Sequence, residues 1–118
     1  MKLLQSFRYA FKGFFAALQS ELNMKIHLLI SSCVFVAGAY LNITSTEWAL
    51  VLLCMGLVLS LELINTAIEK LLNKIHPEFD ETIGLAKDIS ASAVLVASGF
   101  AVIIGAIVFV PYLLKLFF

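Results

Sequence analysis

Residues 47–72 read EWALVLLCMGLVLSLELINTAIEKLL, an apolar run that is long enough to cross a membrane as one helix. An α-helix rises ~1.5 Å per residue, so about twenty apolar residues cross a hydrocarbon core of ~30 Å. We therefore predict a membrane-spanning helix over residues 47–72.

The polar residues of this span lie on one face of the predicted helix. Glu62 and Glu69 are seven residues apart, about 10 Å along the helix axis, with Asn65 and Thr66 between them. A carboxylate at membrane depth costs at least ~2.5 kcal/mol, and such residues usually serve a function. The two carboxylates would bind a hard cation such as Mg²⁺, or one would accept a proton from a hydroxyl. The alternative is structural: a protonated carboxyl, or a pair with a basic residue that fixes helix packing.

The composition agrees with a membrane protein. Of the 118 residues, 62% are hydrophobic and only 14% are charged, whereas about a quarter of the residues are charged in soluble domains. The formal net charge is zero, which argues against a polybasic surface for nucleic acid. Cys33 and Cys54 lie inside apolar stretches, so we expect neither a disulfide framework nor a metal cluster.

Two further apolar segments, at about 26–43 and 86–116, are also long enough to span a membrane. Before them, residues 3–22 place apolar side chains at helical spacing, with basic and amide residues largely on other faces. This pattern predicts an amphipathic helix that lies in the membrane interface. The predicted fold is therefore an all-α integral membrane protein, with a surface helix and three transmembrane helices in a single domain over 1–118.

The connections between the spans predict the topology. A polar turn at 42–46 joins the first two spans, and a charged connector at 73–84, in which Pro77 stops the helix, joins the last two. Seven of the eight basic residues lie within residues 2–25 or in and beside the second connector. Because cytoplasmic loops are enriched in Lys and Arg, we place the N-terminus and this connector in the cytoplasm.

Small residues recur every four positions in the third span, at Ala93, Ala97, Ala101 and Gly105. Such a stripe lets another helix approach closely, either within one subunit or between copies of the chain. His27 and His76 have no partner at metal-ligand spacing, and we interpret both as interfacial packing residues.

Several motifs of soluble enzymes are absent. The chain has no GxxxxGK[ST] phosphate loop, no GxGxxG after a strand, no Ser/His/Asp set and no CxxC. Glu21, Lys87 and Asp88 stand at the cytoplasmic ends of their predicted helices and could converge with Glu69. The residues alone thus predict an acidic, metal-binding site that faces the cytoplasm, without specifying its reaction.

The stretch ELINTAIE at 62–69, followed by Ala86-Lys87-Asp88 and the small residues 90–93, resembles the signature of the prokaryotic diacylglycerol kinase family. The resemblance extends over nearly the whole chain, from Phe11-Lys12-Gly13 to the C-terminus. It implies a homotrimer of three-span subunits whose active sites are shared between neighbours on the cytoplasmic side. It also implies ATP- and Mg²⁺-dependent phosphorylation of the hydroxyl of a membrane lipid, in the bacterial cytoplasmic (inner) membrane.

The resemblance also assigns roles to individual positions. Glu62 is similar to the general base that takes the proton of the lipid hydroxyl, and Asn65 orients groups around that hydroxyl, so both meet the lipid. Glu21 and Glu69 are similar to the carboxylates that hold Mg²⁺ against the ATP phosphates. The positions that it assigns to ATP binding are Lys12, Glu21, Glu69, Glu78, Asp80, Lys87 and Asp88. The sequence departs from the family at Asn73, where many members carry Asp, and at Phe79-Asp80, where a Tyr-His pair is commoner.

The choice of lipid rests on two short segments. Residues 21–27, ELNMKIH, and 77–79, PEF, resemble the undecaprenol kinase branch of the family more than its diacylglycerol branch. We therefore favour undecaprenol, with diacylglycerol phosphorylated to phosphatidic acid as the alternative. A different class of protein, a non-catalytic oligomeric ion pathway, would need polar residues through the full span. Residues 48–61 contain only Cys54 and Ser60 as weakly polar residues, which favours a closed site.

Overall fold

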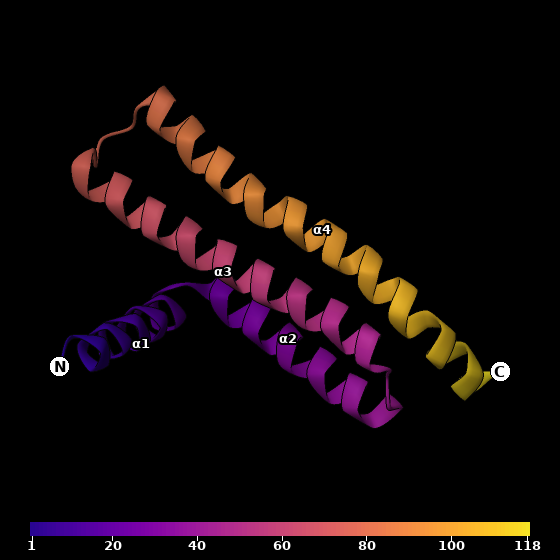
Figure 1. The fold of residues 1–118 in the computed structure, drawn as a ribbon. Helices are drawn as coiled ribbons and strands as arrows, with labels where there is room; N and C mark the ends of the chain where they lie inside the picture. Colours follow the sequence, from indigo (N-terminus) through magenta and orange to yellow (C-terminus); the bar gives the residue numbers. More distant parts are fainter.

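The chain folds into four helices, and the computed structural model describes all of residues 1–118. The helices are α1 (Lys2–Ser20), α2 (Leu22–Leu41), α3 (Ser45–Ile75) and α4 (Glu81–Phe117). α2, α3 and α4 run side by side, while α1 leaves them at an angle (Figure 1). By length and composition, α2, α3 and α4 can each cross a membrane. The predicted fold class, a surface helix followed by three spans, is confirmed.

Most helix ends extend beyond the apolar runs that predicted them, whereas α2 ends at Leu41 rather than near residue 43. α2 begins at Leu22 rather than near residue 26, α3 ends at Ile75 rather than 72, and α4 begins at Glu81 rather than 86. The added turns carry charged or polar residues. Hydropathy marks only the part of a helix that suits hydrocarbon, whereas the backbone hydrogen bonds continue until a residue caps them. α3 ends two residues before Pro77, as expected for a residue that cannot donate a backbone hydrogen bond.

α1 presents a broad apolar face to its surroundings. Phe7, Phe11 and Phe15 are each more than half exposed, and Ala17 is the one buried residue of the helix. This arrangement suits a helix that lies in the membrane interface with its phenylalanines toward the acyl chains. The extended backbone of Glu21 (φ −117°, ψ 119°) separates α1 from α2 and sets the change of direction between them.

The turn between α2 and α3 is fixed by a capping box. Asn42 ends α2 in the left-handed region (φ 53°). The Thr44 hydroxyl then accepts a hydrogen bond from the Glu47 backbone N–H at 3.2 Å, and the Glu47 carboxylate accepts one from the Thr44 N–H at 2.9 Å. Tyr112 of α4 donates its hydroxyl hydrogen to the same carboxylate at 2.5 Å. The end of α4 is thereby tied to the start of α3.

The apolar core lies near this turn. Ile43, Val51 and Val108 form a buried cluster that joins the three spans. Gly38 packs beneath Trp48, where an added Cβ atom would lie 2.9 Å from the indole ring, so a glycine is needed at this crossing. Most other apolar side chains of the spans are exposed, which suits helices that face lipid or further copies of the chain.

The small-residue stripe of α4 is only partly used within one subunit. α4 packs along the length of α3. Ala97 is buried at 7% exposure, Ala101 and Gly105 are half-buried, and Ala93 is exposed. The stripe therefore supports packing inside the subunit at its centre and leaves one end open.

Candidate active site

Glu62 is a buried carboxylate in the middle of α3. The residue is only 2% exposed, and its Oε2 atom lies 3.9 Å from Nε2 of His27 on α2. The charges of Glu21 and Glu69 also act on Glu62, so three carboxylates and one imidazole share this region. Burial of a carboxylate is costly unless polar partners or a ligand compensate it. The buried position of Glu62 therefore calls for a polar partner or a ligand in this region.

Asn65 lies one turn further along α3 and is held from a neighbouring helix. The residue is 5% exposed, and its Oδ1 atom accepts a hydrogen bond of 2.8 Å from the Ser90 hydroxyl of α4. Thr66 is buried next to Asn65, and its hydroxyl has no hydrogen-bond partner. The polar face predicted for residues 62–69 thus turns inward, toward α2 and α4.

A cavity of about 340 Å³ opens beside Glu62 and Asn65. Three helices contribute to its wall, and the lining residues are Asn23, Ile26, His27, Glu62, Asn65, Ala91, Val94, Leu95 and Ser98. Its wall is polar on α3 and apolar on α4 except for Ser98. Such a cavity can accept a ligand that has both a hydroxyl group and a hydrocarbon part.

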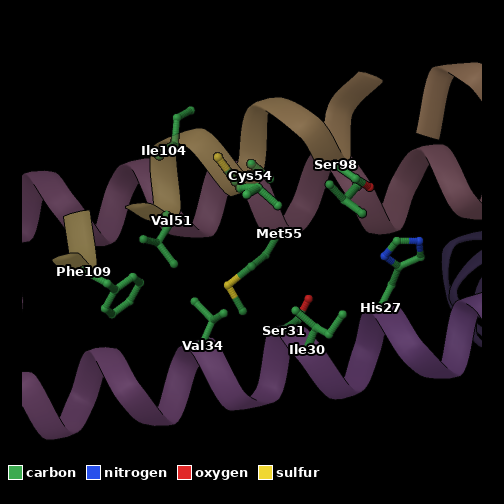
Figure 2. A pocket seen from close by; sticks show the side chains of 14 residues that line it. His27, Ile30, Ser31, Val34, Val51, Cys54, Met55, Ser98, Ile104 and Phe109 are labelled. Carbon is green, nitrogen blue, oxygen red and sulfur yellow. The ribbon is translucent and has the colours of Figure 1, made fainter. Parts of the chain in front are cut away.

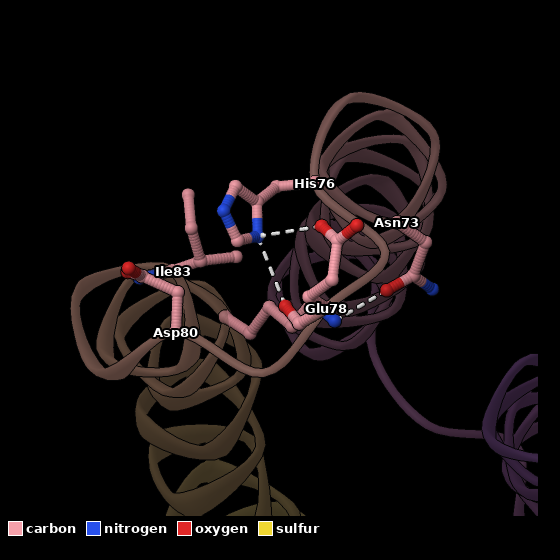
Figure 3. Close-up of polar contacts among 6 residues, drawn as sticks. Asn73, His76, Glu78, Asp80 and Ile83 are labelled. Carbon is pink, nitrogen blue, oxygen red and sulfur yellow. Dashed lines mark hydrogen bonds and ion pairs between the residues drawn. The ribbon is translucent and has the colours of Figure 1, made fainter.

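A second group of polar residues lies where α3 and α4 are joined (Figure 3). Lys87 of α4 donates a hydrogen bond to the side-chain oxygen of Asn73 on α3. His76 contacts the Glu78 backbone oxygen through Nδ1 at 2.9 Å and lies 3.7 Å from its carboxylate. Asp80 accepts a hydrogen bond from the Ile83 N–H and caps α4. Asn73, a departure from the family pattern, is therefore the residue that holds Lys87.

The site residues expected from the sequence fall into two groups within one chain. Glu62 and Asn65 line the cavity, and Glu21 and Glu69 are half-buried close to it. The α3–α4 junction contains Glu78, Asp80 and Lys87. It begins at Asn73, which lies about 16 Å from Glu62 along the axis of α3 at a rise of ~1.5 Å per residue. Lys12 and Asp88 are exposed and form no ion pair or side-chain hydrogen bond. A single chain thus assembles the inner part of the expected site.

Glu21 and Glu69 fit a magnesium site that is shared with a phosphate, but not a site made by protein side chains alone. No group of three or more His, Cys, Asp or Glu side chains is placed to hold a metal ion by itself. At phosphate sites, however, Mg²⁺ is commonly bound by one or two carboxylates together with substrate phosphates and water. Glu21, between α1 and α2, and Glu69 of α3 supply oxygen ligands of that type. The residues therefore fit a cation that is shared with a phosphate.

Sequence reasoning missed three polar residues of this region. His27 was interpreted as a packing residue, yet it faces Glu62, and Ser90 holds Asn65. Ser98 lines the cavity with a buried hydroxyl that has no partner. A usable signal was present, because Ser90 and Ser98 are eight residues apart and so share one face of α4.

The fold and the site together define a helical integral membrane protein with a buried carboxylate beside an amphiphilic cavity. The family described as prokaryotic diacylglycerol kinase matches residues 8–109, and the chain belongs to that family. It is therefore a membrane lipid kinase that uses a nucleotide as phosphoryl donor. This relationship confirms the resemblance seen in residues 62–69 and 86–93.

Related proteins carry two names. The chain is 37% identical to a diacylglycerol kinase of Synechocystis over 97% of this chain and 66% of that protein. It is 32% identical to the undecaprenol kinase of Bacillus subtilis over 95% of this chain and 91% of that protein. It is 29% identical to the diacylglycerol kinase of Escherichia coli over 86% of this chain and 84% of that protein. The chain thus spans about two thirds of the Synechocystis protein and most of the other two.

Proposed function

We propose that this protein transfers the terminal phosphoryl group of ATP to the primary hydroxyl of undecaprenol. The observation that carries the proposal is the position of Glu62. This buried carboxylate lies on a membrane-spanning helix and contributes to the wall of a cavity that has both polar and apolar lining residues. A base is needed at this depth, because the hydroxyl of a membrane lipid does not leave the interface. The likeness to the undecaprenol kinase of Bacillus subtilis over 91% of its length supports this substrate.

In the proposed reaction, Glu62 accepts the hydroxyl proton as the lipid oxygen attacks the γ-phosphorus of ATP. A new oxygen–phosphorus bond forms, and the bond between that phosphorus and the bridging oxygen of ADP breaks. Asn65, held by Ser90, orients the hydroxyl. Phosphoryl transfer needs mainly positioning, charge neutralisation and a base near the nucleophile. Asn65 supplies positioning, and Glu62 supplies the base.

The outer polar residues are proposed to bind the nucleotide. When bound, Mg²⁺ neutralises phosphate charge, and we assign Glu21 and Glu69 as its carboxylate ligands. Lys87 is proposed to contact the phosphates through its ammonium group, with Asp88 beside it. Lys12, Glu78 and Asp80 complete the set of residues proposed to meet ATP.

Orientation and assembly are part of the same proposal. The basic residues near α1 and the α3–α4 junction support a cytoplasmic location for the N-terminus and the site, in the inner membrane of a bacterium. The turn at 42–44 would then lie outside. A homotrimer with shared sites is supported by the exposed faces of the three spans. It would also give Lys12 and Asp88, which have no partner within one chain, a neighbouring subunit to complete the site.

Diacylglycerol is the second candidate substrate. The Synechocystis relative, at 37% identity, is named a diacylglycerol kinase, and both lipids present a primary hydroxyl at the interface. Apolar pockets discriminate weakly between related chains, so the choice needs a direct assay.

The test is phosphoryl transfer by the purified protein in lipid micelles with labelled ATP and Mg²⁺, offering undecaprenol and diacylglycerol separately. We expect product from undecaprenol, and none from Glu62→Gln, which keeps the size of the side chain but cannot accept the proton. Faster turnover of diacylglycerol would make it the substrate. Full activity of Glu62→Gln would remove Glu62 as the base.

A further inference from the structure

A second cavity of about 260 Å³ lies between α2, α3 and α4, and Figure 2 shows its lining. It extends from His27 and Ser98 at one end to Phe109 at the other. Ten of its fourteen lining residues are hydrophobic, with Val34, Val51 and Met55 along its length. The cavity lies between the helices of one chain, so its walls come from all three spans.

The two cavities meet at the level of Glu62. His27 and Ser98 line both of them. The Ser98 hydroxyl is buried there without a hydrogen-bond partner, whereas nearly all buried polar groups in proteins have one. A polar group of a ligand at this junction would supply the missing partner, while the apolar part of the same ligand continued toward Phe109.

We propose that the apolar cavity binds a hydrocarbon chain of the lipid alcohol, and that Ser98 bonds to the polar end of this lipid. This inference rests on the proposed function and specifies its substrate class. A cavity of ~150 Å³ holds the six carbons of benzene, so 260 Å³ suits roughly ten carbons.

The size of the cavity favours an alcohol with a single chain. One chain of about ten carbons fills it, and the rest of a longer prenol would extend into the bilayer. Diacylglycerol carries two chains close to its hydroxyl, and the second would have no counterpart in this cavity. Because membrane lipid is as apolar as the cavity wall, the selection comes from shape and contact rather than from the hydrophobic effect.

Two glycines of α4 provide a matched pair of variants. Gly105 lines the cavity, and an added Cβ atom there meets no other atom within 4 Å. Gly99 lies on the same helix with equally open surroundings, but it lines neither cavity. Gly105→Leu should therefore fill part of the cavity, while Gly99→Leu adds the same side chain outside it. Both replace glycine in a helix, so their effects on helix propensity are alike.

The test is photolabelling of the full-length protein in lipid nanodiscs. The probe is a long-chain prenol with a diazirine at about the tenth carbon from its hydroxyl. Mass spectrometry of the wild type should place the label near Val34, Val51 and Phe109. This labelling should fall at least fivefold in Gly105→Leu and remain unchanged in Gly99→Leu. Label spread evenly over the exposed faces of the spans, in all three proteins alike, would overturn the inference.

A smaller substitution, Ser98→Ala, tests the proposal even if Gly105→Leu does not fold. Ser98→Ala removes only the unpaired hydroxyl, and we expect it to raise the KM for the prenol roughly fivefold without changing the KM for ATP. An unchanged KM for the prenol would exclude the bond to Ser98. Labelling requires no phosphoryl transfer, so a labelled cavity in an inactive protein would refute the proposed function alone. An active kinase with no label in the cavity would refute this inference alone.

Discussion

Nε2 of His27 lies 3.9 Å from Oε2 of Glu62, across the contact between α2 and α3. The carboxylate side chain is 3% exposed and the imidazole 21%, so the histidine connects a buried group with the adjoining cavities. The contact engages one carboxylate oxygen. The histidine therefore faces one oxygen of the carboxylate, and the other oxygen is available to receive the proton of the lipid hydroxyl.

His27 should act through Glu62, as a positioning residue. We expect His27→Gln to lower kcat about tenfold with little change in the KM for ATP, because the carboxylate loses its fixed orientation. A double-mutant cycle with Glu62→Asp, which keeps a carboxylate base and measurable turnover, checks the mechanism: the double variant should be no slower than Glu62→Asp alone. Additive losses would show that the two residues act independently.

Ser90 should affect catalysis because its hydroxyl donates a hydrogen bond that orients the Asn65 side chain. Ser90→Ala removes the donor of the 2.8 Å hydrogen bond and leaves Oδ1 of a buried amide unsatisfied. We expect kcat/KM for the lipid to fall roughly five- to tenfold. Ser92→Ala is the control, since its exposed hydroxyl bonds only to the backbone oxygen of Ile89 in its own helix. Equal losses in both variants would assign the effect to α4 in general and not to Asn65.

Lys87 should determine affinity for the nucleotide. Lys87→Met keeps much of the side-chain length but removes the ammonium group, and we expect the KM for ATP to rise about tenfold while the KM for the lipid changes little. Lys74→Met is the control, because Lys74 is exposed in the last turn of α3 and forms no ion pair. If the KM of Lys87→Met for ATP equals that of the wild type, Lys87 does not contribute to nucleotide binding.

The capping box at the start of α3 should contribute to stability and not to chemistry. Thr44→Ala removes the acceptor for the Glu47 N–H, and loss of an N-cap typically costs ~1 kcal/mol. We expect unfolding at a lower detergent concentration and unchanged specific activity of the folded protein. Thr46→Ala, two residues away and exposed, should behave as the wild type. A loss of activity without a loss of stability would contradict this assignment.

Much of the site could be predicted from the sequence because the relevant residues lie on one helix. Glu62, Asn65 and Thr66 recur at helical spacing, and the structure buries all three on the inner face of α3. The positions of Glu78 and Asp80 could not be predicted as well, since both lie on the connection between α3 and α4, and Lys12 and Asp88 lie on helices other than α3. Their distances from Glu62 depend on how separate helices are arranged.

The sequence by itself determined the number of spans, the surface helix and the inward polar stripe, because hydropathy and helical periodicity act within a segment of twenty to thirty residues. Only the tertiary structure decided that His27 faces Glu62, that Ser90 holds Asn65, and that two cavities meet at Ser98. These contacts depend on the rotation and the vertical register of α2, α3 and α4. Rotation and register are set by packing between helices, as where Gly38 admits Trp48, and no single segment encodes them.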